Sequence, residues 1–175
     1  PNTAYDLFLT PLQDILCLVD RENGTLITFS TRSQEVIETI SVRPEGSKKG
    51  LNLAFDAANQ RVYLTDNQSF ILYILHLQSM YLEKKDIGLG GYALGNLALS
   101  PDESHLYLLT VKPTVGLHYF DLQNSTLEKQ IELKGELLSV GSGAPQDLMT
   151  LTPNKEHLLL MTYLDEPEPF TPVIT

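Results

Sequence analysis

The 175-residue sequence contains a single cysteine, no tryptophan and no long hydrophobic run. One cysteine excludes a framework of intramolecular disulfides. Because Cys17 lies in the apolar run 15–19, we expect a buried, unreactive thiol rather than a nucleophile. The longest apolar stretches, such as 70–75, have the length of a strand, so the sequence predicts no transmembrane helix.

Positive charge is also scarce, since 12 Lys and Arg residues stand against 22 Asp and Glu residues. The net charge of −10 repels nucleic-acid phosphates and anionic membrane surfaces. We therefore expect neither a nucleic-acid partner nor membrane insertion. The hydrophobic fraction of 42% is ordinary for a soluble globular protein, and the acidity favours solubility.

Four stretches of the sequence align with one another without gaps. They cover residues 7–20, 53–66, 97–110 and 148–162, the last being one residue longer at its start. Anchored on Thr10, Asp56, Ser100 and Thr152, the stretches follow one another at intervals of 46, 44 and 52 residues. Such periods indicate a repeat architecture.

Each aligned stretch has the pattern of a β-hairpin. Apolar residues alternate with small or polar ones on both sides of a short polar turn, as in 97–110. The turn carries Ser-Pro-Asp, Thr-Pro or Thr-Pro-Asn, in which Pro presets φ and Asp or Asn can bond back to its own backbone. A second pair of strands follows at 24–42, 70–89 and 115–134. Each unit thus carries about four strands, separated by Gly/Pro/Ser-rich links at 43–50, 88–95 and 139–145.

Four strands in a repeat of about 45 residues are typical of a β-propeller blade. The sequence "LALSPDESHLYLLT" at 97–110, with "YFDLQNSTLEKQIEL" at 119–133, resembles the YVTN-type propeller repeat of bacteria and archaea. The resemblance covers nearly the whole chain and implies an all-β propeller of four-stranded antiparallel blades. The WD40 pattern fits less well, because the chain has neither Trp nor a Gly-His pair.

The predicted propeller is a single partial one over residues 1–175, with about 3.5 blades. The repeat units are predicted at approximately 5–46, 51–90, 95–140 and 146–175. Since propellers have roughly four to eight blades, this ring is incomplete. The sequence begins without Met, and we expect a piece of a longer chain that supplies further blades. The alternatives are a homodimer that closes a seven-bladed ring and a four-bladed monomer with a degenerate last blade.

The histidines do not form a predicted site. His105 and His157 occupy equivalent repeat positions, which Arg61 and Ile15 fill in the other units. A position that accepts three such different side chains serves the blade first. No two histidines have the close spacing of a metal pair. We therefore predict no catalytic, cofactor-binding or metal-binding residue, and no cofactor.

Two other motifs are interpreted as turns. The glycine-rich stretch 88–95 resembles a phosphate loop, but a strand rather than a helix is expected from Asn96 onward. We expect its glycines to permit a tight crossing between blades. Three N-glycosylation patterns, at 23–25, 67–69 and 124–126, all fall in predicted turns, where Asn and Ser are expected anyway.

Candidate interaction residues lie on the predicted top-face loops. Asp20 and Asp66 end the second strands of their units, where a short acid usually caps the following turn. The segment 163–172 contains acids and three prolines, and it interrupts the fourth unit as a rigid acidic loop near the channel mouth. The candidate residues are Asp20, Arg21, Asp66, Tyr92, Lys112, Asp165 and Glu166.

The function predicted from these loops is a non-catalytic scaffold that binds a protein or another ligand across the top face. The connections expected there are 43–52, 66–70, 88–96, 110–116, 139–147 and 163–172. The resemblance also leaves open an enzyme of lactonase or haem/quinone-cofactor type, with its site partly in other blades, and a repetitive cell-surface component. We expect a bacterial periplasmic or cell-surface location, with the cytoplasm as the alternative.

Overall fold

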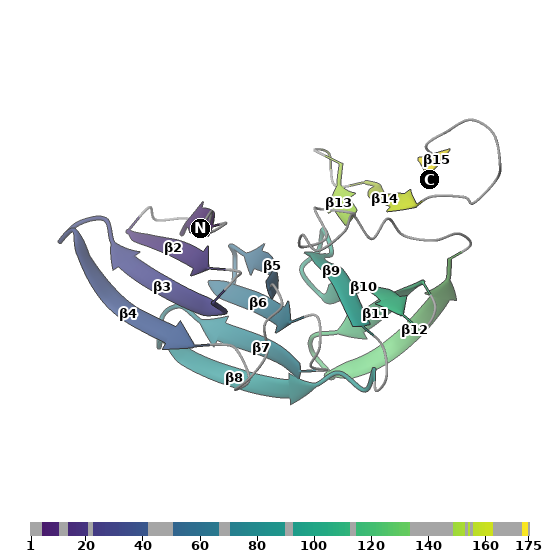
Figure 1. The fold of residues 1–175 in the computed structure, drawn as a ribbon, viewed down its shortest axis with the longest axis horizontal. Coiled ribbons are helices and arrows are strands. Elements are labelled where there is room, and N and C mark those ends of the chain that lie inside the picture. The colour runs from purple at the N-terminus through teal and green to yellow at the C-terminus, as the bar shows by residue number, and fades with distance from the viewer. Residues whose placement is uncertain are drawn as a thin grey trace. The chain divides into compact units, whose positions relative to one another are not determined.

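The computed structural model describes most of the strands and tight turns of the chain (Figure 1). The described residues are 5–10, 14–20, 23–41, 51–66, 71–89, 93–112, 115–133, 149–152, 154, 156–162 and 173–174. Their regular structure is entirely β. In this part of the chain there is no helix with the length and apolarity needed to cross a membrane.

The strands form four separate antiparallel sheets, which we call blades 1 to 4 in chain order. Blade 1 contains β1 (Tyr5–Leu9), β2 (Ile15–Asp20), β3 (Thr25–Ser30) and β4 (Glu35–Ser41). Blade 2 contains β5 (Leu51–Asp56), β6 (Arg61–Asp66), β7 (Ile71–His76) and β8 (Tyr81–Asp86). Blade 3 contains β9 (Ala93–Leu99), β10 (His105–Lys112), β11 (Gly116–Asp121) and β12 (Thr126–Glu132). Blade 4 contains β13 (Met149–Leu151), β14 (Leu158–Thr162) and β15 (Val173–Ile174).

Neighbouring strands in each blade are also neighbours in sequence, so each blade is a simple meander. This confirms the sheet arrangement predicted from the period-2 alternation. The chain divides into two compact units, Pro1–Lys85 and Asp86–Thr175. The first unit carries blades 1 and 2, and the second carries blades 3 and 4.

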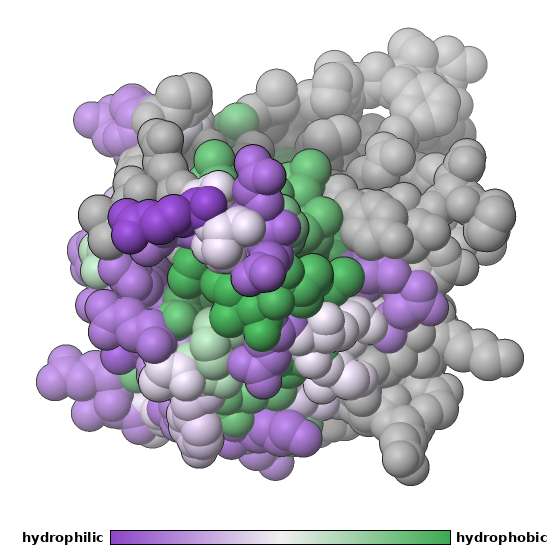
Figure 2. Space-filling model, turned by 90° about the vertical axis from the view of Figure 1, so that its left-hand side faces the viewer, coloured by the Kyte–Doolittle hydropathy of each residue, from purple (hydrophilic) through white to green (hydrophobic). Residues whose placement is uncertain are grey.

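The two faces of blade 1 differ in their exposure. Successive side chains of a strand point to opposite faces, and residues paired across strands share a face. One face carries Leu7, Leu9 and Val36, which are among the most exposed large apolar residues of the described chain. On the side of the molecule shown in Figure 2, apolar residues form a patch bordered by hydrophilic residues.

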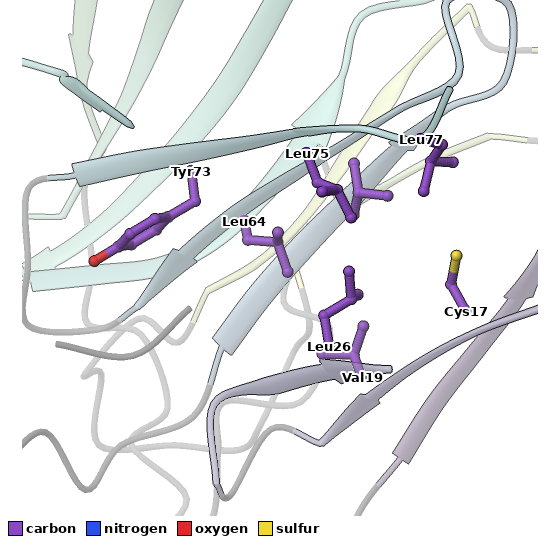
Figure 3. Packing of buried hydrophobic residues seen from close by; sticks show 8 residues of the cluster. Cys17, Val19, Leu26, Leu64, Tyr73, Leu75 and Leu77 are labelled. Atoms are coloured by element: carbon purple, nitrogen blue, oxygen red, sulfur yellow. The ribbon is translucent and has the colours of Figure 1, made fainter. Parts of the chain in front are cut away.

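The other face of blade 1 forms the core of the first unit. Cys17, Val19 and Leu26 are completely buried and pack in one cluster with Leu64 and Leu75 of blade 2 (Figure 3). Burial raises the pKa of the Cys17 thiol to about 12, which keeps the thiol protonated and unreactive. The prediction of a buried cysteine is thus confirmed. A second cluster, in the other unit, joins Leu109 and Leu117 of blade 3 to Met149 and Leu160 of blade 4.

The third and fourth strands of a blade are joined by four-residue turns with a common backbone conformation. The last turn residue has a left-handed φ in each of the three: Gln34 (φ 58°), Met80 (φ 54°) and Ser125 (φ 58°). Gln60, at the end of the turn between β5 and β6, does the same with φ 51°. A positive φ is energetically unfavourable for a non-glycine residue, and these hairpin turns nevertheless require it at their last position.

The start of β9 differs from the prediction. The link was predicted to extend to residue 95, whereas β9 already begins at Ala93. Register shifts near Thr110 let β10 continue to Lys112, which pairs with Ala93. A β-bulge of this kind adds residues to one strand without ending the ladder, so the crossing between blades is shorter than expected. The strand after the glycines excludes a phosphate loop.

The turn conformation gives a direct test of hairpin energetics. We expect Gln60→Gly to raise the free energy of unfolding by about 1 kcal/mol, because glycine adopts a positive φ without a steric penalty. Ala58→Gly, an exposed substitution in the same turn, should lower it by about 0.5 kcal/mol through added chain entropy. Urea denaturation of both variants measures the difference. Equal effects of the two substitutions would contradict the assigned turn geometry.

Candidate functional site

Each blade has two ends with different chemistry. The upper end is where the second strand finishes, and the lower end is where it begins. The second strands are β2, β6, β10 and β14. The top-face loops predicted from the sequence belong to the upper ends. The lower ends consist of short turns, for which the structure gives hydrogen bonds in all four blades.

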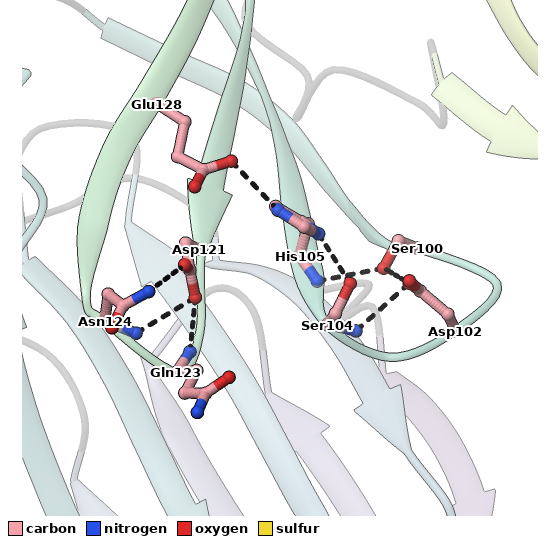
Figure 4. A network of polar contacts seen from close by, with 8 residues as sticks. All are labelled: Ser100, Asp102, Ser104, His105, Asp121, Gln123, Asn124 and Glu128. Carbon is pink, nitrogen blue, oxygen red and sulfur yellow. Dashed lines mark hydrogen bonds and ion pairs between the residues drawn. The ribbon is translucent and has the colours of Figure 1, made fainter.

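The lower end of blade 3 holds a network of hydroxyl and carboxylate groups (Figure 4). The Ser100 hydroxyl donates to Asp102 Oδ1 at 2.6 Å and accepts the His105 backbone N–H at 2.9 Å. The Ser104 backbone N–H also donates to Asp102 Oδ1, at 3.2 Å. Hydrogen bonds from Ser100 and then Ser104 lower the pKa of Asp102 to about 2. The Ser-Pro-Asp motif is therefore a turn lock, as the sequence predicts.

The same hydroxyl lock recurs in two other blades. In blade 1 the Thr10 hydroxyl accepts the Ile15 backbone N–H at 3.2 Å and donates to Asp14. In blade 4 the Thr152 hydroxyl accepts the His157 backbone N–H at 3.1 Å and donates to an amide oxygen. The hydroxyl thus occupies a repeat position, and its role is to close the first hairpin of the blade.

A second lock pairs an aspartate with the asparagine three residues later. The pairs are Asp20–Asn23 in blade 1, Asp56–Asn59 in blade 2 and Asp121–Asn124 in blade 3. In each pair the carboxylate accepts both the backbone N–H and the side-chain N–H of the asparagine. The Asn124 backbone N–H, followed by its amide, lowers the pKa of Asp121. Such pairs stabilise turns without any ligand.

These pairs also bear on the glycosylation patterns. The side-chain nitrogens of Asn23 and Asn124 each donate to a carboxylate at 2.6 Å. Both asparagines therefore stabilise their turns through these hydrogen bonds, which agrees with the interpretation of the patterns as turns. The third pattern, at 67–69, lies outside the described residues.

Ser104, His105 and Glu128 have the residue types of a hydrolase triad. His105 Nδ1 lies 2.5 Å from Ser104 Oγ, and His105 Nε2 lies 3.0 Å from Glu128 Oε2. However, Glu128 is exposed to solvent, so the pair gains little from a low dielectric. In the other blades the serine and histidine positions hold pairs such as Gln60 and Arg61. We interpret the trio as a surface network of one hairpin.

The upper end of blade 3 contains a buried polar group that sequence reasoning did not single out. His118 is completely buried, and its Nε2 lies 3.0 Å from Thr110 Oγ1. The Thr110 hydroxyl donates to the Gly116 carbonyl oxygen at 3.2 Å. A Cβ on Gly116 would lie 3.2 Å from both side chains, so only glycine fits without displacement. Burial lowers the pKa of His118 and favours the neutral imidazole.

Buried asparagines extend this polar character to the first strands of two blades. Asn52 in β5 and Asn96 in β9 are repeat-equivalent, 44 residues apart, and both are buried. Asn96 Oδ1 accepts the Leu97 backbone N–H at 2.7 Å. In blade 2 the Thr65 hydroxyl is buried and has no hydrogen-bond partner among the described residues. An asparagine recurring within an apolar strand was the available sequence signal.

The structure describes three of the seven predicted interaction residues. Asp20 makes the turn-capping contacts described above, whereas Asp66 and Lys112 are the last residues of β6 and β10. The other candidates, Arg21, Tyr92, Asp165 and Glu166, lie outside the described part of the chain. Across the described ranges no three His, Cys, Asp or Glu side chains are grouped so that they could hold a metal ion.

Comparison with known proteins establishes the fold class. The chain resembles hydrazine synthase of Kuenenia stuttgartiensis (TM-score 0.66, 14% identity, 96% of this chain and 44% of that one). It also resembles the β-propeller domain of Cps50 (Swd1) of Myceliophteria thermophila (0.60, 12%, 93% and 50%). A third similar structure is the dihydro-heme d1 dehydrogenase NirN in complex with DHE (0.66, 13%, 91% and 33%).

These likenesses confirm the predicted fold. The chain has the fold of a β-propeller, with three- or four-stranded antiparallel blades. It spans between 33% and 50% of the length of the structures it resembles. No family model matches the sequence, and no curated protein matches it.

The buried histidine predicts a pH dependence of stability. The pKa of His118 in the folded chain lies below its ordinary value of 6.5. As the pH falls, His118 therefore takes up a proton in the unfolded chain before it does so in the folded chain. The free energy of unfolding should therefore fall as the pH drops below about 6.5. Denaturation curves between pH 7.5 and pH 5, the range around that value, measure the slope. His118→Gln should flatten it, whereas His157→Gln, at an exposed position, should not. An unchanged slope in His118→Gln would refute this assignment.

Proposed function

We propose that the protein is a non-catalytic propeller scaffold of the YVTN type, which binds a protein partner across its upper end. The observation that carries the proposal is the contrast between the two ends of the blades. The hydroxyl locks and the aspartate locks of blades 2 and 3 lie at the lower ends, where the acids serve the turns, whereas the Asp20 lock of blade 1 lies at the upper end. In repeat proteins the variable loops gather on the binding face.

The upper connections differ from blade to blade. Between the second and third strands they have 4 residues in blades 1 and 2, 3 in blade 3 and 10 in blade 4. The strands beside them end in Asp20, Asp66, Lys112 and Thr162, so the aspartate of blades 1 and 2 is replaced by other residue types in blades 3 and 4. The long connection, 163–172, carries three acids and three prolines. Prolines restrict its conformations, which lowers the entropy lost when a partner binds.

The charge of the chain suggests the character of this partner. With a net charge of −10 and an acidic upper loop, the scaffold would attract a protein with a positively charged surface. Complementary charge of this kind accelerates encounter and is weakened by salt. Asp165 and Glu166 are the residues we assign to this contact.

The scaffold is tested with charge-neutralising variants of equal size. The wild-type chain is immobilised to capture its partner from cell extract, and the affinity of the purified pair is then measured by calorimetry. Asp165→Asn with Glu166→Gln should weaken binding about tenfold and reduce its salt dependence. The control pair, Glu35→Gln with Glu38→Gln on exposed positions of β4, removes the same charge and should bind like wild type. If the two double variants bind the partner with equal affinity, the assignment of the contact to the acidic loop is wrong.

One alternative function has support from the similar structures. Hydrazine synthase is an enzyme, and NirN is described as a dehydrogenase in complex with DHE. A propeller of that kind would hold a haem-type or quinone cofactor, and a lactonase would need a bound metal. A visible absorption band of the purified chain, or hydrolysis of sugar lactones with a stoichiometric metal, would favour the enzyme over the scaffold.

A further inference from the structure

The exposed face of blade 1 carries seven apolar positions. Strand register places them on one side of the sheet: Leu7, Leu9, Leu16, Leu18, Ile27, Phe29 and Val36. The exposed fractions of Leu7, Leu9 and Val36 are 62%, 47% and 58%, and the other four are partly buried. We call these seven residues the open face. An apolar patch bordered by polar residues is typical of an interaction surface.

The repeat shows what such a face packs against. The first two blades are offset by 46 residues, so adding 46 to each residue number of the open face gives the equivalent position in blade 2. These are Leu53, Phe55, Val62, Leu64, Tyr73, Leu75 and Leu82. All seven belong to the cluster that packs blade 2 against Cys17, Val19 and Leu26 of blade 1. In blade 2, therefore, this face is covered by the opposite face of another blade.

Blade 4 shows the same arrangement in the second unit. Met149, Leu158 and Leu160 occupy open-face positions and pack with Leu109 and Leu117 of blade 3. Leu109 and Leu117 are in turn the repeat equivalents of two buried residues on the opposite face of blade 1, Val19 and Leu26. Two independent contacts thus join an open-type face to the opposite face of the preceding blade.

We propose that the open face of blade 1 is a docking site for a blade of a second copy of this chain. The chain itself presents a face of the complementary kind. In β14, Leu158 and Leu160 pack on blade 3, so Leu159 between them belongs to the other side of blade 4, and it is only partly buried. One copy therefore offers both halves of the interface that the repeat uses internally.

Such a contact is heterologous, because two different surfaces meet. It closes into a ring if the rotation between copies allows this, and otherwise extends into a chain of copies. A dimer closed in this way would join the four blades of each copy in one ring. The site is a sheet face rather than a blade end, so the inference does not depend on the proposed upper-end scaffold.

Sedimentation over a range of protein concentrations tests the docking. We expect the 175-residue chain to associate reversibly, with dimers or larger assemblies that dissociate on dilution. Leu9→Gln and Val36→Gln should each raise the dissociation constant at least about tenfold, which corresponds to about 1.4 kcal/mol. Both residues are already exposed in a single copy, so the fold should tolerate the changes, and circular dichroism verifies this.

The matched control is Ile37→Gln. Ile37 has the same exposed fraction as Leu9, 47%, but it lies at the irregular register of β4 and outside the open face. This variant should associate like wild type. A chain that stays monomeric up to its solubility limit would overturn the proposal, as would an assembly that all three substitutions weaken equally. A monomer would indicate that the face is covered by another kind of blade.

Discussion

The structure depends on one recurring contact, in which an apolar sheet face of one blade packs against the opposite face of the blade before it. In the first unit this contact is made by Leu64 and Leu75, which pack in one cluster with Val19 and Leu26. In the second unit Leu160 packs with Leu109. A four-stranded meander has two apolar faces and cannot cover either of them by itself. Stacking of blades is therefore the source of the hydrophobic stabilisation, and the repeat period follows from it.

The polar chemistry of the lower ends follows from the same constraint. Tight hairpins place backbone N–H groups where no ladder partner is available, and Ser100, Thr10 and Thr152 accept them through their hydroxyls. Aspartates such as Asp56 do so through a carboxylate. These groups resemble catalytic residues in type, but their hydrogen-bonding capacity is taken up by the turns. Acid content alone is thus a poor guide to a site in such a repeat.

The sequence predicts the hairpins and their turns well because alternation and Pro-Asp chemistry are local signals. It does not predict the register shift between Thr28 and Phe29 or its equivalent in blade 3, since a bulge leaves the alternation intact on both sides. The burial of His118 was also missed. Its repeat equivalents are Ile27 and Tyr73, so the position is apolar in the other two complete blades, and the alignment was the available signal for burial.

A repeat separates structural from functional positions by a simple rule. A side chain that recurs at one position in several blades, such as the turn hydroxyl of blades 1, 3 and 4, has a role that those blades share, and that role is structural. The features that do not recur are therefore the candidates for function, and they include the 10-residue connection of blade 4, the buried His118 and the exposed face of blade 1. The open face of blade 1 is periodic in sequence, yet it is more exposed than the equivalent face of blade 2. The proposed docking site rests on that difference, whereas the proposed scaffold rests on the irregular upper loops.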